Sequence, residues 1–214
     1  MSTDQQEPTP EPWGYVEPLM SEGDADYNDT LRGVGLVLHE WTLVEIALSH
    51  LQAILEGNPR DGAAIQAYGM GRVFSSRLEG FKQVARTYFV RNSHQHREAE
   101  LDGLVLQASG FATRRNEVAH GALRDFHILD LKTGERTRKI CYFLVCPYYD
   151  QRGKSLVDYP FYIYNAATLN HLAINIAGLQ VALETFSDLM MPDEAALVDR
   201  RPWIRGLPTT SGKS

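Results

Sequence analysis

A short run of residues near the middle of the chain combines side chains that phosphodiester chemistry requires. Arg115 and Asn116 are followed by His120 and Gly121, in the pattern Arg-Asn-x-x-x-His-Gly. An arginine stays charged at physiological pH and presents forked N–H donors to phosphate oxygens. A histidine titrates near neutral pH and can carry a proton. Residues of these types at this spacing are candidates for a site that holds a phosphate and moves a proton beside it.

The run ends a predicted helix over residues 97–120. At about 100° per residue, Arg115 falls inside the apolar arc of this helix, and Asn116 and His120 are stacked neighbours on the edge of that arc. A guanidinium on an inward face is costly to bury unless it is paired or opens into a cleft, so this conflict marks a candidate site. Arg114 is expected to point away from the arc into solvent, where it could contact the backbone of a substrate. The apolar residues of the arc are Leu101, Leu104, Val105, Ala108, Phe111, Ala112 and Ala119.

Three further helices are predicted around this one, which gives a mainly α fold built on four helices. Apolar residues at three-and-four spacing indicate helices over residues 29–56, 62–90 and 166–189. Gly121 stands where a C-cap glycine belongs. The predicted N-caps are Asn28, Asp29 or Thr30 for the first helix and Asn165 for the last.

A small antiparallel β insertion is predicted at about 126–164, between the third and fourth helices. Three runs, 126–131, 140–146 and 156–164, are rich in β-branched and aromatic residues and are separated by turn sequences. The aromatic side chains could stack RNA bases, but a hairpin core or a dimer contact is the favoured interpretation. They are Tyr142, Phe143, Tyr148, Tyr149, Tyr159, Phe161, Tyr162 and Tyr164.

Charge divides the chain into three segments. Residues 1–26 form an acidic, proline-containing arm with seven acids and no Lys or Arg, and residues 192–214 read as a tail. The body, 27–191, has 17 acids and 17 bases within a net charge of −6 for all 214 residues. A neutral body does not suit broad, charge-driven binding of duplex DNA, but it allows a local basic cleft that grips one or two phosphates.

A cytoplasmic location without membrane insertion is expected. The N-terminal segment lacks the basic start and apolar core of a signal peptide, and apolar runs are short and broken by charge. The two cysteines, Cys141 and Cys146, fit neither a zinc site nor a disulfide framework, which is typical of a reducing compartment. No metal-binding carboxylate cluster is evident in the sequence.

The motif of Arg115, Asn116, His120 and Gly121, late in the third helix of a four-helix pattern, resembles that of the HEPN superfamily. The resemblance implies a metal-independent endoribonuclease that needs no cofactor and acts in toxin–antitoxin, phage-defence or RNA-processing systems. It implies a homodimer in which two motifs face each other, with RNA as substrate and an antitoxin or regulatory protein as a possible partner. Arg115 and His120 would be the catalytic pair, and Asn116 would orient the imidazole or hold phosphate. Cleavage would leave a 2′,3′-cyclic phosphate.

Two other interpretations stay open. The chain could be a catalytically inactive HEPN-like module that binds RNA, a nucleotide or a protein. It could also be a purely structural scaffold, in which Arg115 pairs with Glu45, Glu79 or Glu117 and His120 hydrogen-bonds the last helical turn. An inactive module predicts Arg115 in a buried carboxylate pair and His120 against packed side chains. Trp41 and Glu45 are expected to serve in packing and pairing.

Overall fold

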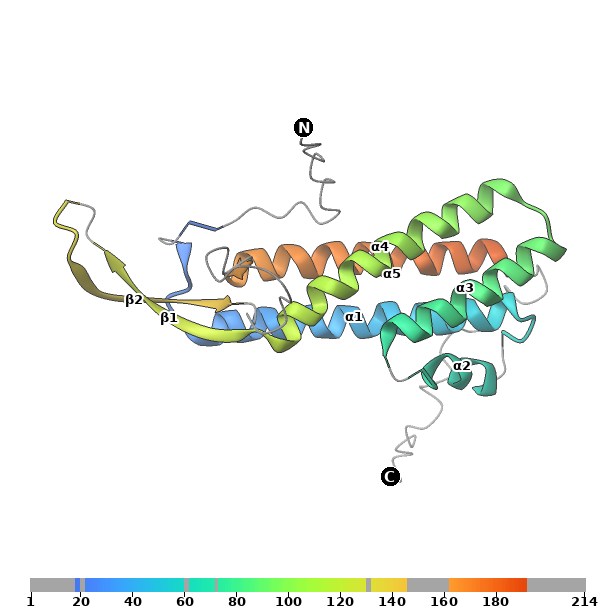
Figure 1. Cartoon of the computed structure of the whole chain (residues 1–214), viewed down its shortest axis with the longest axis horizontal. Helices are drawn as coiled ribbons and strands as arrows, with labels where there is room; N and C mark the ends of the chain where they lie inside the picture. The colour runs from blue at the N-terminus through green and yellow to red at the C-terminus, as the bar shows by residue number, and fades with distance from the viewer. Residues whose placement is uncertain are drawn as a thin grey trace, which may run out of the picture.

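Five helices and a three-stranded antiparallel sheet make up the described part of the chain (Figure 1). The computed structural model describes residues 18–19, 22–59, 62–71, 73–129, 132–145 and 162–191. The elements are α1 (Tyr27–Leu55), α2 (Gly62–Gly69), α3 (Phe74–Arg91), α4 (Gln95–His120), β1 (Ala122–Leu129), β2 (Arg136–Val145), β3 (Ile163–Tyr164) and α5 (Ala166–Met190). The prediction of a mainly helical fold with a small antiparallel β insertion before the last helix is confirmed.

The helical body is built on α1 and α5, which start beside the sheet and run next to each other in the same direction (Figure 1). Gly33 allows their close approach, because a Cβ there would lie 2.8 Å from the Cβ of Leu169. Helices α3 and α4 form an antiparallel pair that packs on them. The largest fully buried helical side chains of the core are Leu48, Leu51, Phe81, Leu101, Phe111, Leu169, Ile176, Leu183 and Phe186.

The predicted helix over 62–90 is wrong as a single element. It is broken between Gly69 and Phe74 into α2 and α3. The turn between them is held from within α3, where Nη1 of Arg77 donates to the carbonyl oxygen of Gly71 at 3.0 Å. Two glycines within three residues weaken a helix, and this contact gives the chain an alternative hydrogen bond at the break.

The cap of α1 lies upstream of the predicted candidates. Asp26 is the N-cap, and its side chain accepts the N–H of Asn28 at 2.9 Å. The predicted cap of α5 is confirmed: Asn165 accepts from the N–H of Thr168, whose hydroxyl accepts from the N–H of Asn165, a complete capping box.

The last residues of the expected N-terminal arm belong to the fold. The backbone of Asp24 pairs with that of Tyr142 in β2, and its carboxylate accepts from the Thr30 hydroxyl and from the N–H of Ala166. A Cβ on Gly23 would lie 2.6 Å from the ring of Phe143. This segment therefore joins the starts of α1 and α5 to the sheet. Residues 1–17 of the arm and the tail 192–214 lie outside the described residues.

The sheet has the strand order β1-β2-β3. Strand β1 begins at Ala122, directly after α4 and four residues before the predicted start. Of the third predicted run, only Tyr162 to Tyr164 are described, and the stretch 146–161, with Cys146 and four of the aromatic residues, lies outside the described part. Phe143, Tyr162 and Tyr164 are buried, which confirms the core interpretation for these three.

Helices α1 and α5 are long and apolar enough to cross a membrane by length and composition alone. In the most apolar window of each, 39% and 33% of the residues are buried within the fold. A core helix of a bundle has the same composition, so this property does not decide between the two settings. The cytoplasmic location stays a prediction.

Candidate functional site

Arg115 is held against helix α1. Its Nη2 donates to Oε1 of Glu45 at 3.1 Å, and its guanidinium carbon lies 5.3 Å from the centre of the Trp41 ring. The side chains of Arg115 and Glu45 are each 22% exposed. Of the three carboxylates named as pairing candidates, Glu45 is the one that Arg115 contacts. The pairing expected for Trp41 and Glu45 is confirmed, since the indole N–H donates to the same Oε1 at 2.7 Å.

A second arginine, Arg77 of α3, binds the same carboxylate. Its Nη2 lies 2.8 Å from Oε1 and 2.7 Å from Oε2 of Glu45. Two guanidinium groups and one carboxylate leave this cluster with a net charge of about +1. We call Trp41, Glu45, Arg77 and Arg115 the arginine cluster. An excess positive charge at a position that solvent reaches only in part favours an anion as ligand.

The turn between α2 and α3 encloses the Arg77 side chain. Besides the hydrogen bond to Gly71, its guanidinium carbon lies 6.0 Å from the centre of the Tyr68 ring. Burial, and next the charge of Glu45, raise the pKa of Tyr68 well above its usual value, so its hydroxyl stays neutral. Sequence reasoning missed Arg77, because it lies 38 positions from Arg115 in a segment predicted as one uninterrupted helix. The signal that could have drawn attention to this segment is the pair Gly69 and Gly71.

Asn116 is exposed and contacts Arg115, not His120. Its Oδ1 accepts from Nη1 of Arg115 at 2.9 Å. The Arg115 guanidinium is therefore shared between an amide at the surface and a carboxylate on α1. Of the two roles expected for Asn116, orienting the imidazole is not seen here, and holding phosphate stays a prediction. The contact that the structure shows is with the Arg115 guanidinium.

His120 is the last residue of α4 and is exposed to solvent. Within the described part of the chain, no hydrogen bond or ion pair engages its imidazole. Five positions along a helix correspond to about 140° of rotation, so Arg115 and His120 leave α4 in different directions. The sequence motif therefore brings Arg115 and Asn116 together, while His120 stands apart on the same helix end.

Arg114 is not solvated, which corrects the sequence expectation. Its residue is 8% exposed, its Nη1 lies 2.6 Å from Oε2 of Glu117, and its guanidinium carbon lies 3.8 Å from the centre of the Tyr162 ring. The hydroxyl of Tyr164 donates to the same Glu117 oxygen at 3.2 Å. The periodicity of α4 predicted this position wrongly because Tyr162 and Tyr164 cover a second side of the helix. Arg114 joins α4 to Tyr162, and its contact with a substrate backbone stays a prediction.

Gly121 ends α4 without a left-handed conformation, since its φ is −63°. Its role is close packing: a Cβ would lie 2.8 Å from Cγ of Leu144 in β2. The prediction of a C-cap at this position is confirmed, but the reason for the glycine is the approach of the sheet to the helix end that carries His120.

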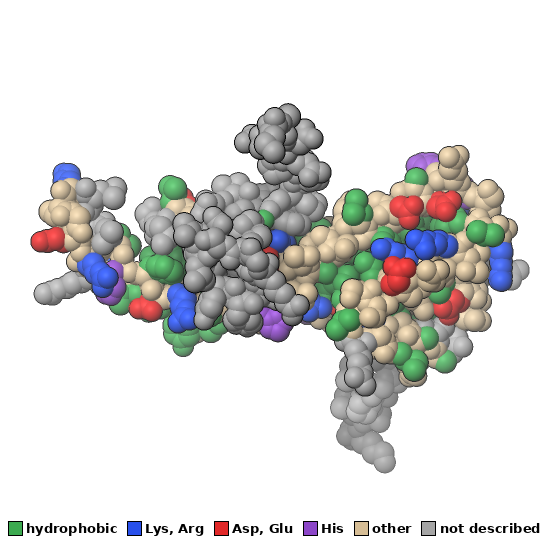
Figure 2. Space-filling model, viewed as in Figure 1, with side chains coloured by type: hydrophobic (Ala, Val, Ile, Leu, Met, Phe, Trp, Pro, Cys, Tyr) green, Lys and Arg blue, Asp and Glu red, His purple; other side chains and the backbone are tan. Residues whose placement is uncertain are grey.

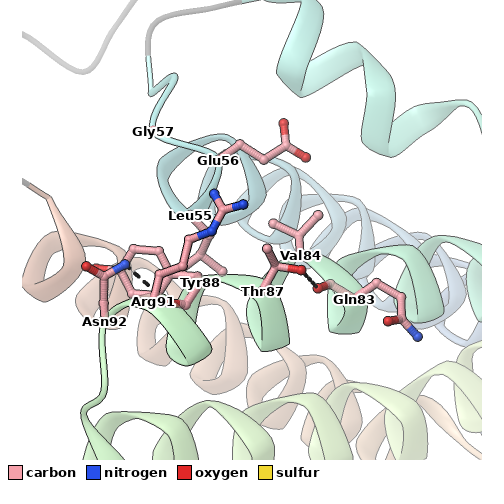
Figure 3. A pocket seen from close by; sticks show the side chains of 9 residues that line it. All are labelled: Leu55, Glu56, Gly57, Gln83, Val84, Thr87, Tyr88, Arg91 and Asn92. Carbon is pink, nitrogen blue, oxygen red and sulfur yellow. Dashed lines mark hydrogen bonds between the residues drawn. The ribbon is translucent and has the colours of Figure 1, made fainter.

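A groove of about 490 Å³ lies between the C-terminal end of α1 and helix α3 (Figure 3). Leu55, Val84 and Tyr88 line it, with Glu56 and Arg91 among its polar residues. None of the predicted site residues lines this groove. It lies near the start of α4, and His120 ends that helix 25 residues later, a length of about 38 Å.

The surface shows no single basic face in the view of Figure 2. Lys, Arg, Asp and Glu side chains are intermixed over the helical end, and the hairpin of β1 and β2 carries Arg, Lys and His side chains. Exposed basic residues of the hairpin are Arg124, His127, Lys132, Arg136 and Lys139. Among the described residues, no group of three His, Cys, Asp or Glu side chains is placed to hold a metal ion.

Comparison with known proteins adds no relative. No family model, no curated protein and no solved structure matches this chain.

Proposed function

We propose that this protein is a HEPN-like, metal-independent endoribonuclease. The observation that supports it best is the positively charged arginine cluster, whose member Arg115 lies on α4 five residues before the exposed His120. A fixed cation and a titratable group are the two parts that cleavage of RNA by its own 2′-hydroxyl requires. The cytoplasmic location, a role in toxin–antitoxin, phage-defence or RNA-processing systems, and an antitoxin or regulator as partner belong to this proposal.

The chemistry follows from the roles of two side chains. Neutral His120 accepts the proton of a ribose 2′-hydroxyl, and the 2′-oxygen forms a bond to the adjacent phosphorus. The guanidinium of Arg115 stabilises the negative charge that grows on the phosphoryl oxygens. The bond from phosphorus to the 5′-oxygen breaks, and this oxygen takes a proton from an imidazolium or from water. The products are a 2′,3′-cyclic phosphate and a 5′-hydroxyl.

The different directions of Arg115 and His120 support a site shared by two copies of the chain. An imidazole and a guanidinium that leave one helix about 140° apart do not converge on one phosphate without rearrangement. In a two-fold symmetric dimer, each surface contacts its equivalent, so Arg115 of one protomer can face His120 of its partner. The different directions of the two side chains therefore support the homodimer that the motif implies.

The test uses purified full-length protein and unmodified single-stranded RNA in excess EDTA. Wild type is expected to cleave, and Arg115→Ala and His120→Ala to lose at least about a hundredfold in rate. Cyclic phosphate ends, detected by mass spectrometry, identify the mechanism. Cleavage only after addition of a divalent metal contradicts the proposal, and equal cleavage by all three proteins indicates a contaminating nuclease.

A second candidate function is a catalytically inactive module that binds RNA, a nucleotide or a protein. The ion pair between Arg115 and Glu45 favours it, because the guanidinium already has a carboxylate partner. The exposure of His120 does not favour it, since an inactive module predicts that this side chain is packed. Binding of RNA without any cleavage in the same assay would select this alternative.

A further inference from the structure

The arginine cluster contains one more cation than the sequence motif supplies. We propose that Arg77 is a positioning residue that keeps Arg115 available to an RNA phosphate by taking the larger share of the Glu45 carboxylate. This inference rests on the proposed function for the identity of its ligand. It assigns a role to helix α3, which carries none of the motif residues.

The distances show how the carboxylate is divided. Arg77 reaches both oxygens of Glu45, at 2.7 and 2.8 Å, whereas Arg115 reaches one oxygen at 3.1 Å. Both Arg77 contacts come from the single atom Nη2, and charge-assisted hydrogen bonds of 2.7 and 2.8 Å are stronger than one of 3.1 Å. Arg77 is therefore the main partner of Glu45, and Arg115 is the weaker one.

Arg77 is the fixed member of the cluster. Its side chain is 16% exposed and also donates to the carbonyl of Gly71. A Cβ on Gly71 would lie 2.7 Å from Cγ of Arg77, so the turn is shaped around this side chain. Arg115, in contrast, contacts the exposed amide of Asn116 on its outer side. Because this partner lies at the surface, the Arg115 guanidinium can exchange it for a ligand.

The net charge of the arginine cluster depends on Arg77. Glu45 alone with Arg115 would form a neutral pair, and an RNA phosphate would have to displace a full carboxylate charge. With Arg77 present the cluster keeps a charge of about +1, which a phosphate can neutralise. The Nε atoms of Arg77 and Arg115 are buried and have no hydrogen-bond acceptor within the described residues, so donors exceed acceptors here.

The experiment measures binding of a short single-stranded RNA with 2′-O-methyl groups, which lacks the nucleophile, by fluorescence anisotropy. Arg77→Met is expected to weaken binding by about tenfold, because it makes the cluster neutral. Glu45→Gln is expected to tighten it by about tenfold for the opposite reason. The double variant Arg77→Met/Glu45→Gln restores the charge of +1 and should bind like wild type. Arg86→Met, at an exposed arginine of the same helix, is the matched control and should also bind like wild type.

Restored RNA binding in the double variant would show that Arg77 acts through the charge of the cluster. If Arg77 were needed only for the structure, a second substitution would not restore binding. Equal binding by Arg77→Met and wild type would overturn the inference, and so would a double variant as weak as Arg77→Met. If Arg77→Met does not fold, Glu45→Gln decides alone, and binding no tighter than wild type overturns the inference.

Cleavage of unmodified RNA in EDTA is scored separately. If the variants bind RNA as expected but wild type does not cleave it, the proposed nuclease activity is contradicted and the role of Arg77 is not. If wild type cleaves RNA but Arg77→Met binds it equally well, the role of Arg77 is contradicted and the nuclease activity is not.

Discussion

Arg115 and Glu45 lie 3.1 Å apart across the interface of α4 and α1, although 70 positions separate them in the chain. This contact turns a guanidinium on the inward arc of α4 toward a carboxylate that Trp41 also contacts. Two roles of Arg115 are compatible with this contact: a catalytic cation that leaves Glu45 when RNA binds, or one half of a structural ion pair.

Adjacent arginines on α4 should respond in opposite ways to the same substitution. Arg114→Met should lower the free energy of unfolding by about 2–3 kcal/mol, because it leaves the partly buried Glu117 without its cation. Arg115→Met should cost less stability, since Glu45 keeps Arg77, but it should abolish RNA cleavage. Urea unfolding followed by circular dichroism, with cleavage measured on the same samples, checks both. Loss of cleavage in Arg114→Met at a temperature where it is fully folded would speak against a purely structural Arg114.

The indole N–H of Trp41 should stabilise the arginine cluster. Trp41→Phe keeps an aromatic ring beside Phe74 but removes the donor to Glu45, and hydrogen bonds to charged groups contribute about 1.5–3 kcal/mol. Because the carboxylate keeps both arginines, the expected loss in unfolding free energy is at the lower end of this range. Denaturant unfolding measures it. An unchanged midpoint would mean that this hydrogen bond contributes nothing in solution.

Alanine should have opposite effects on stability at Gly121, the C-cap of α4, and at Gly103 within α4. Gly121→Ala should destabilise the fold by about 1–3 kcal/mol, because its Cβ would press on Leu144. Gly103→Ala is the matched control: nothing lies within 4 Å of its Cβ, and alanine should stabilise the helix by up to about 1 kcal/mol. Thermal unfolding of both variants decides, and a Gly121→Ala protein as stable as wild type would contradict the close approach of β2 to the end of α4.

These cases show what the sequence could and could not predict. Periodicity located α1, α4 and α5 to within about two residues, since their buried faces repeat over many turns. It did not predict the break between α2 and α3, although Gly69 and Gly71 weaken the helix there, because the hydrogen bond of Arg77 to Gly71 depends on a contact that periodicity does not describe. It misplaced Arg114 because helical periodicity assumes one buried side, and Tyr162 covers another. Glu45 was named as one of three possible partners of Arg115, and three-dimensional contact was needed to choose among them.

Stability should decrease in mildly acidic solution because of His50 on α1. Burial, opposed in part by the charge of Glu184, lowers the pKa of His50 below its usual value of 6.5. The unfolded chain therefore binds a proton at a higher pH than the folded one, so stability falls as the pH drops through about 6.5 and levels off below the folded-state pKa. Unfolding midpoints between about pH 7.5 and about pH 5.5 test this. His50→Gln should show a shallower decline, and an identical decline in this variant would assign the effect to other groups.

The most direct test of the proposed shared site is complementation between two inactive variants. Arg115→Ala and His120→Ala proteins are mixed, partly denatured and refolded together, and cleavage of RNA in EDTA is compared with each variant alone. A site built from Arg115 of one protomer and His120 of its partner predicts that the mixture regains about a quarter of wild-type activity, because half of the dimers are mixed and each has one intact site. A mixture as inactive as its components, while wild type refolded in the same way cleaves RNA, would contradict a site shared between two copies.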